Sequence, residues 1–198
     1  MRIILTSIAN NYFPKAIVLA RSLKKFHPDV HFVVVLSDKK IINEEHDCMK
    51  DIDEIIEISN LPIKDFKNWA FKHDVEELCT AVKPIALKLL LQRNNVTELL
   101  FIDPDIKIFS PLDPIFNALK DNDVLLTPHL THPELTINGI ADNEIAALKH
   151  GIFNLGFLGL TKSKNAIDFV NWWEERLSFF CYKDYLNGLW TDQKWVNL

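Results

Sequence analysis

The stretch Leu99-Leu100-Phe101-Ile102-Asp103-Pro104-Asp105 decides how the rest of the chain is interpreted. Its first four residues form a short apolar run, which is typical of a strand buried on both faces. Two carboxylates follow, two residues apart, at the carboxyl end of that predicted strand. Ligands of open α/β sheets bind outside the carboxyl ends of the strands. Because Mg²⁺ and Mn²⁺ prefer oxygen ligands, Asp103 and Asp105 predict a metal site at this edge.

The same Asp-Pro-Asp has a plainer interpretation as a turn. Proline fixes φ, and an aspartate side chain can cap the segment that follows it. The next residues, Ile106-Lys107-Ile108, form a second short run typical of a β-strand. A surface turn seldom lies between two buried runs. The context therefore favours the metal site, and the turn remains the alternative.

Strand and helix patterns alternate along the chain. Apolar runs predict strands over 2–8, 32–36, 54–58, 99–102, 124–127 and 152–160. Helical patterns cover 12–25, 75–92 with a kink or break at Pro84, 112–119, and a segment from the capping residue Ser163 to about Phe180. This alternation predicts one α/β domain over 1–198, with a mainly parallel central sheet and helices on both faces.

Composition narrows the functional classes. The chain has 198 residues and a formal net charge of −5, which argues against a nucleic-acid partner. No apolar run approaches the roughly 20 residues that a transmembrane helix needs, and the apolar start is too short for a signal peptide. The three cysteines, Cys48, Cys79 and Cys181, form neither a CxxC pair nor a disulfide framework. These features predict a protein of the reducing cytoplasm.

The positions of the glycines exclude two phosphate-binding motifs. All five glycines lie in the last third of the chain, so the first strand-turn-helix carries neither a dinucleotide fingerprint nor a Walker A loop. If the protein binds a nucleotide, a metal must balance the phosphate charge in place of a glycine loop. This inference leads back to Asp103 and Asp105.

Four segments in order resemble the motifs of one enzyme family. They are TSIANNY at 6–12 followed by ARSL at 20–23, LFIDPD at 100–105, FNLGFL at 153–158, and TDQK at 191–194. Each match is weak alone, but together they span nearly the whole chain. The sequence resembles the GT-A fold glycosyltransferases, close to the retaining galactosyl- and glucosyltransferase and glycogenin group.

This resemblance implies a fold, a reaction and a set of roles. The fold is the Rossmann-like nucleotide-diphospho-sugar transferase fold. The reaction is metal-assisted hexose transfer, with retention, from a nucleotide-diphosphate sugar such as a UDP-sugar to a glycan or another hydroxyl acceptor. The implied donor-binding residues are Thr6, Ala9, Asn11, Tyr12, Lys83, Asp103, Asp105 and Gly156; Asp103 and Asp105 also hold Mn²⁺ or Mg²⁺, and Asn154, Asp192 and Gln193 orient the sugar for catalysis.

The chain departs from the family in three places. Ala9 stands where the family often carries an acidic residue near the nucleobase, which leaves the base open. Ala86 aligns with an expected arginine, and either Lys83 or Lys88 is left to supply that charge. The sequence ends at Leu198, before family segments that supply a histidine metal ligand and much of the acceptor site. A truncated chain or a minimal catalytic core is therefore expected.

The individual residues also have structural interpretations. Lys83 could be a solvated helix lysine beside Pro84, and Asp192 could be the N-cap of a helix through Trp195. Asn154 is expected to be buried in a strand and hydrogen-bonded, either to backbone or to a sugar hydroxyl, with Gly156 allowing close approach of a ligand. Two rival functions remain: a sugar-nucleotide-binding domain with weak catalysis, and a Mg²⁺-dependent phosphohydrolase with Asp103 as nucleophile.

Overall fold

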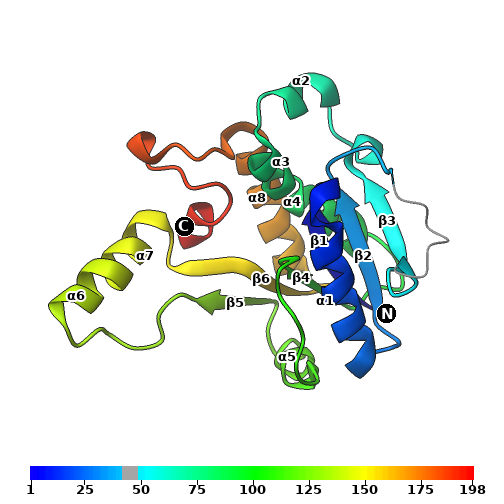
Figure 1. Cartoon of the computed structure of the whole chain (residues 1–198), viewed down its shortest axis with the longest axis horizontal. Coiled ribbons are helices and arrows are strands. Elements are labelled where there is room, and N and C mark those ends of the chain that lie inside the picture. Colours follow the sequence, from blue (N-terminus) through cyan, green and yellow to red (C-terminus); the bar gives the residue numbers. More distant parts are fainter. Residues whose placement is uncertain (42–48) are drawn as a thin grey trace.

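The computed structural model describes residues 1–41 and 49–198, and its centre is a six-stranded sheet (Figure 1). The strand order is β3-β2-β1-β4-β6-β5. Strands β1 to β4 run parallel, and β6 runs antiparallel to both β4 and β5. The strands are β1 (Arg2–Ile8), β2 (His31–Leu36), β3 (Glu54–Glu57), β4 (Glu98–Ile102), β5 (Val124–Pro128) and β6 (Phe153–Thr161). The predicted, mainly parallel sheet is thus confirmed.

Helices connect most of the strands. They are α1 (Phe13–Phe26), α2 (Phe66–Phe71), α3 (Val75–Ala81), α4 (Lys83–Leu91), α5 (Asp113–Ala118), α6 (Ile137–Gly139), α7 (Ile145–His150) and α8 (Lys164–Phe180). The predicted break near Pro84 is confirmed, because α3 ends at Ala81 and α4 begins at Lys83. Ser163 caps α8 as predicted, since its Oγ accepts a hydrogen bond from the Ala166 N–H.

Two hydrophobic layers bury the two faces of the sheet. On one face, α3, α4 and α8 pack over strand residues such as Leu5, Val33 and Phe101. On the other face, α1 and α5 pack over residues such as Ile4 and Leu100. Alternate residues of a strand point to opposite faces, so the continuous apolar runs read from the sequence serve both layers. The site described below lies on the α3–α4 side.

Some local predictions are wrong. The run Ile106–Ile108 is not a strand, because the Ile108 N–H donates to Ser22 Oγ (2.9 Å) on α1 and not to a neighbouring strand. Helix α2 and the arm formed by α6 and α7, which projects from the ends of β5 and β6 (Figure 1), are not anticipated by the sequence patterns. Cys48 lies outside the described residues.

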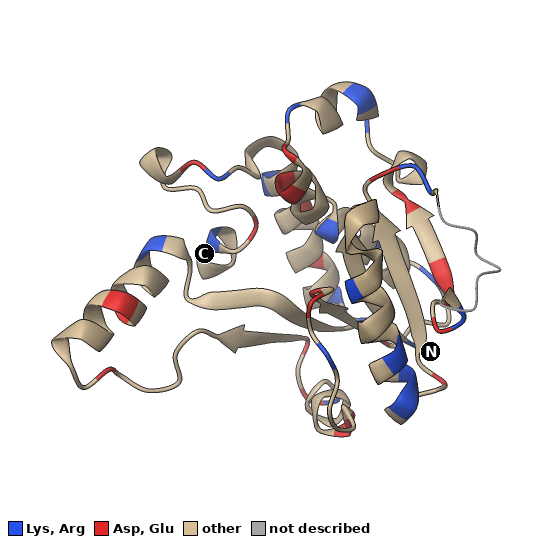
Figure 2. Ribbon diagram, in the orientation of Figure 1, with Lys and Arg blue, Asp and Glu red and all other residues tan. Residues whose placement is uncertain are grey.

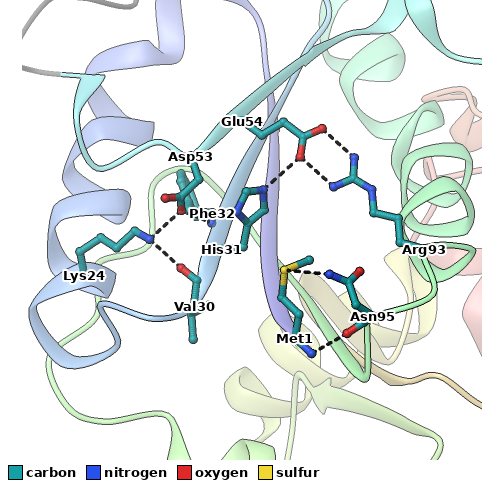
Figure 3. Close-up of polar contacts among 9 residues, drawn as sticks. All are labelled: Met1, Lys24, Val30, His31, Phe32, Asp53, Glu54, Arg93 and Asn95. Carbon is teal, nitrogen blue, oxygen red and sulfur yellow. Dashed lines mark hydrogen bonds and ion pairs between the residues drawn. The ribbon is translucent and has the colours of Figure 1, made fainter.

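A charged network joins the amino ends of β2 and β3 to the end of α4 (Figure 3). The Arg93 guanidinium donates to both oxygens of Glu54, at 2.8 and 2.7 Å, and His31 Nε2 lies 3.0 Å from the same carboxylate. Lys24 pairs with Asp53 nearby. This network lies at the sheet edge opposite the carboxyl ends of the parallel strands. Within the described ranges, no helix has the length and apolar character needed to cross a membrane.

Candidate active site

A cavity of about 470 Å³ opens at the carboxyl ends of β1 and β4. The first residues of β6 lie at the same edge because that strand is antiparallel, and the Asp103 N–H donates to the Gly156 carbonyl at 2.8 Å. Helices α3 and α4 form one wall, and the segment 191–193 forms another. The lining residues include Ser7, Ala9, Asn11, Tyr12, Glu76, Cys79, Thr80, Lys83, Asp103, Asp105, Asn154, Gly156, Thr191, Asp192 and Gln193.

The Asp-Pro-Asp segment is both a turn and part of this wall. The Ile106 N–H donates to the Asp103 carbonyl at 3.1 Å, which closes the turn. Both carboxylates nevertheless line the cavity, so the turn does not exclude a metal site at this place. Asp105 is the more exposed of the two carboxylates, and Lys15 Nζ lies 3.9 Å from it.

Gly156 allows two side-chain oxygens to converge beside it. A Cβ atom at this position would lie 2.8 Å from Asp103 Oδ2 and 2.9 Å from Asn154 Oδ1. Asn154 Oδ1 accepts a hydrogen bond from the Gly156 N–H at 2.8 Å. Because a Cβ atom would lie so close to these oxygens, the space around Asp103 requires a glycine at position 156.

The expectation that Asn154 is buried is wrong. The β5–β6 register shifts at Leu126/Thr127, and residue 154 is exposed there.

Lys83 is buried at the start of α4. Its Nζ lies 3.0 Å from Asp192 Oδ2 and 3.8 Å from Asp103 Oδ1, and it donates to the Leu155 carbonyl. With 8% of the residue exposed, Lys83 is not a solvated helix lysine. Lys88 instead pairs with Glu174. Of the two lysines that the sequence left open, Lys83 supplies the charge in the cavity.

Asp192 is held in place by its neighbours. It is 3% exposed, its Oδ1 accepts from Thr191 Oγ1, and its carbonyl accepts from Trp173 Nε1. Thr191 has φ of 41°, a left-handed conformation that is rare for a β-branched residue and concentrates at functional sites. The final helical turn, Lys194–Asn197, has no side-chain cap. The N-cap interpretation of Asp192 is therefore wrong.

The Gln193 amide joins two segments of backbone. Its Oε1 accepts from the Leu155 N–H at 3.4 Å, and its Nε2 donates to the His150 carbonyl at 3.1 Å. Gly151 makes room for this side chain, since a Cβ there would lie 3.1 Å from Gln193 Cγ. Gln193 thus positions the beginning of β6 against the last segment of the chain.

The cavity carries an excess of negative charge. Burial raises the pKa of Asp103, and the negative charges of Asp192 and Asp105 raise it further against the opposing effect of Lys83. Burial alone lowers the pKa of Lys83, but its attraction to Asp192 and Asp103 outweighs burial and raises that pKa. One ammonium group, that of Lys83, thus lines the cavity together with four carboxyl groups, those of Glu76, Asp103, Asp105 and Asp192. A diphosphate would be repelled from this site unless a cation accompanied it.

The donor atoms fit a cation that takes only part of its ligands from the protein. No group of three or more His, Cys, Asp or Glu side chains within residues 1–41 and 49–198 could hold a metal ion. Asp103 and Asp105 provide carboxylate oxygens, and Asn154 Oδ1 lies beside Asp103. Mg²⁺ commonly binds through one or two carboxylates and fills its other positions with water and phosphate oxygens. The residues present suit that arrangement.

The wall of the cavity nearest β1 differs from the sequence prediction at one residue. Ala9, Asn11 and Tyr12 line the cavity as proposed, but Thr6 is fully buried and does not. Side chains alternate along a strand, and the cavity lies on the α3–α4 face. Ser7 therefore lines it in place of Thr6.

Sequence reasoning also missed cavity residues on the helical wall. Glu76, Cys79 and Thr80 line the cavity together with Lys83. Their separations of three and four residues place them on one helical face. That spacing in the predicted helix over 75–92 is a signal that could have identified them. The strained Thr191 carries no comparable signal in the sequence.

Comparison with known proteins reveals similarity in structure only. No family model and no curated protein matches the sequence. The structure of galactosyltransferase LgtC in complex with donor and acceptor sugar analogues has a TM-score of 0.60 and 18% identity; the match covers 100% of this chain and 69% of that one. The glycosyltransferase GlyE of Streptococcus pneumoniae TIGR4 has a TM-score of 0.58 and 14% identity, with 99% of this chain and 42% of that one covered. The chain therefore has the GT-A fold, as these glycosyltransferases do.

Proposed function

We propose that this protein is a glycosyltransferase that moves a hexose from a nucleotide-diphosphate sugar, with a UDP-sugar as the first candidate, to a hydroxyl of a glycan or another acceptor. The observation that carries this proposal is the convergence of Lys83, Asp103 and Asp192 in one cavity at the carboxyl edge of a GT-A sheet. The sequence motifs and the fold comparison support it independently.

In this proposal, Asp103 and Asp105 would hold a divalent cation, which would supply Lewis-acid stabilisation for the charge of the departing diphosphate. The residues of the chain perform the remaining tasks. Asp192 lines the cavity as a buried carboxyl group, and Lys83 Nζ lies 3.0 Å from its Oδ2. Asn154 and Asp192 orient the transferred sugar, while Gln193 fixes the segments that carry them. We infer retention of configuration from the family resemblance alone.

Nucleotide binding in the presence and absence of metal tests the proposal. The melting temperature is measured with UDP, UDP-glucose and UDP-galactose in Mn²⁺, Mg²⁺ or chelator. Stabilisation should increase with ligand concentration, as linkage requires, and should disappear with chelator. Asp103→Asn and Asp105→Asn should each abolish it, while Asp121→Asn, an exposed surface change, should not. Equal affinity for UDP in Mn²⁺ and in chelator would show that the metal assignment is wrong.

Two enzyme assays separate the rival functions. p-Nitrophenyl phosphate with Mg²⁺ should give no turnover, and rapid hydrolysis that depends on Asp103 would overturn the transferase assignment in favour of a phosphohydrolase. Slow hydrolysis of the bound UDP-sugar by water reports sugar transfer without a known acceptor. If UDP-sugars bind with metal but neither hydrolysis nor transfer occurs, the protein is a sugar-nucleotide-binding domain.

A further inference from the structure

Three segments from distant parts of the sequence meet just outside the cavity, beyond Gln193. The His129 N–H donates to the Ile152 carbonyl at 2.9 Å, which joins the end of β5 to the beginning of β6. The Ile152 N–H donates to Asn197 Oδ1 at 3.1 Å, which brings in the last turn of the chain. Gln193 completes the junction through the His150 carbonyl at the end of α7.

This junction is basic. Lys149 and His150 come from α7, Lys194 from the last turn, and His129 follows β5; we call these four residues the basic rim. Figure 2 shows blue positions, which are Lys or Arg, on α7 and on the last turn beside the C-terminus. Neither lysine has an ion-pair partner among the residues that the structure describes. Burial, together with the positive charges of Lys149, Lys194 and His129, lowers the pKa of His150, and no carboxylate opposes them there.

Aromatic rings are packed into the same place. The Tyr185 and Trp190 ring centroids lie 4.5 Å apart, and the His150 ring lies 4.7 Å from Trp190. Tyr185 remains 49% exposed, and Lys149 Nζ lies 5.4 Å from its ring. The Nδ1 atom of His150 is buried, and within the described part of the chain it has no hydrogen-bond partner. Exposed ring faces beside unpaired cations suit a ligand with an apolar face and an anionic group.

We propose that the basic rim, with Tyr185 and Trp190, is the acceptor subsite and selects a sugar that carries a carboxylate or a phosphate. The inference rests on the proposed function, because it places the acceptor beside the sugar that Asn154 and Asp192 would orient. The sugar ring stacks on the Tyr185 face, and Lys149 and Lys194 bind its anionic group. The donor diphosphate is the other anionic group that Lys149 and Lys194 could bind. Lys149, His150 and Lys194 do not line the cavity that holds Asp103 and Asp105, which favours the acceptor.

Matched sugars test this inference. Saturation-transfer NMR, with UDP and Mg²⁺ present, compares methyl glucuronide with methyl glucoside, and glucose 6-phosphate with glucose. The unmodified protein should bind at least one of the anionic sugars more tightly than its neutral partner. The double variant Lys149→Gln/Lys194→Gln should weaken binding of that sugar about ten-fold and leave the neutral sugar unchanged. Tyr185→Ala should weaken both members of the pair alike.

The control is Lys164→Gln, which removes an exposed lysine at the start of α8 and should keep the preference for the anion. Equal binding of charged and neutral sugars by the unmodified protein, binding of neither, or a preference that survives in the double variant would each overturn the inference. An equal loss of UDP affinity in the double variant would assign the lysines to the donor instead. Failure of metal-dependent UDP binding in the unmodified protein is a separate result, which contradicts the proposed function itself.

Discussion

Two charged clusters lie at opposite edges of the same sheet, and they are built differently. At the amino edge, Arg93 binds both oxygens of Glu54, and His31 approaches the same carboxylate (Figure 3). Charges there are matched, and the side chains are partly solvated. At the carboxyl edge, Lys83 is buried against Asp192 and Asp103. That cluster carries more negative than positive charge.

We infer from this difference that the first cluster stabilises the fold and that the second is arranged for a ligand. The bidentate Arg93–Glu54 pair satisfies its own hydrogen bonds and joins β3 to the residues after α4. The cavity cluster combines like charges, a strained Thr191 and a glycine that leaves space beside Asp103. Unfavourable features of this kind concentrate at functional sites.

Removing the buried cation should have the largest effect on stability. Lys83→Met leaves Asp192 buried without its partner, and breaking a buried pair in this way costs about 3–5 kcal/mol. Urea unfolding of the variant measures this loss. The double variant Lys83→Met/Asp192→Asn should recover a large part of it, because the uncompensated charge is removed. A single variant as stable as the unmodified protein would show that Lys83 is not a buried partner.

Asp192→Asn should impair turnover, and it should also lower stability because it breaks the buried pair with Lys83. If the carboxylate acts only on the reacting sugar, UDP-sugar hydrolysis should fall about 100-fold while UDP affinity barely changes, since contacts made in the transition state alter rate and not ground-state binding. Isothermal titration with UDP and a hydrolysis assay check the two quantities. Full activity in this variant would remove Asp192 from the site and make Asn154 the main candidate.

At the amino edge, Glu54→Gln should reduce stability and leave the site intact. The partly exposed Arg93 pair is worth about 1 kcal/mol after solvent screening. UDP affinity in Mn²⁺ should equal that of the unmodified protein. A variant that loses stability and nucleotide affinity together would contradict the independence of the two edges.

The contribution of Glu54 should also depend on pH. The hydrogen bond from Arg93 lowers the pKa of Glu54 in the folded protein below its ordinary value of 4.5. The native state therefore binds fewer protons than the unfolded chain, and the contribution of Glu54 is present above pH 4.5 and lost as pH falls through the folded pKa. The free energy of unfolding of the unmodified protein and of Glu54→Gln is measured between pH 3 and 7. The difference between the two proteins should shrink as the pH falls towards 3.

Asp103 should show the opposite sign and the smallest effect. Burial raises the pKa of Asp103 in the folded protein above its ordinary value of 3.8. The stability that this group contributes is therefore lost as pH rises from about 3.8 through the raised pKa. Asp103→Asn should therefore be as stable as the unmodified protein or more stable at neutral pH, by less than about 1 kcal/mol because the carboxylate is partly exposed. Melting temperatures at pH 4 and pH 7 measure the difference, which should grow with pH. A marked loss of stability at pH 7 would mean that Asp103 contributes to the fold itself.

The sequence by itself determined the six strands, the long helices and their order along the chain. Apolar runs predicted all six strands, and periodicity with Ser163 and Pro84 located the long helices. The Asp103–Asp105 turn was placed correctly at a strand end. These features are local, because propensity, capping and burial on both faces of a strand are written in neighbouring residues. The same reasoning failed at Ile106–Ile108, where a hydrogen bond to Ser22 on a distant helix decides the conformation.

Only the tertiary structure decided which of these residues act together. The structure places Lys83, and not Lys88, in the cavity, and Ser7 lines the cavity where Thr6 was expected. Asp192 forms a buried ion pair with Lys83 and does not cap a helix. Each choice depends on contacts between residues far apart in the chain. Lys83 and Asp192 are brought to 3.0 Å only when α4 and the final segment pack at the same edge of the sheet. Pair distances of this kind, and the pKa shifts that follow from them, arise from the packing of whole elements and have no local signature in the sequence.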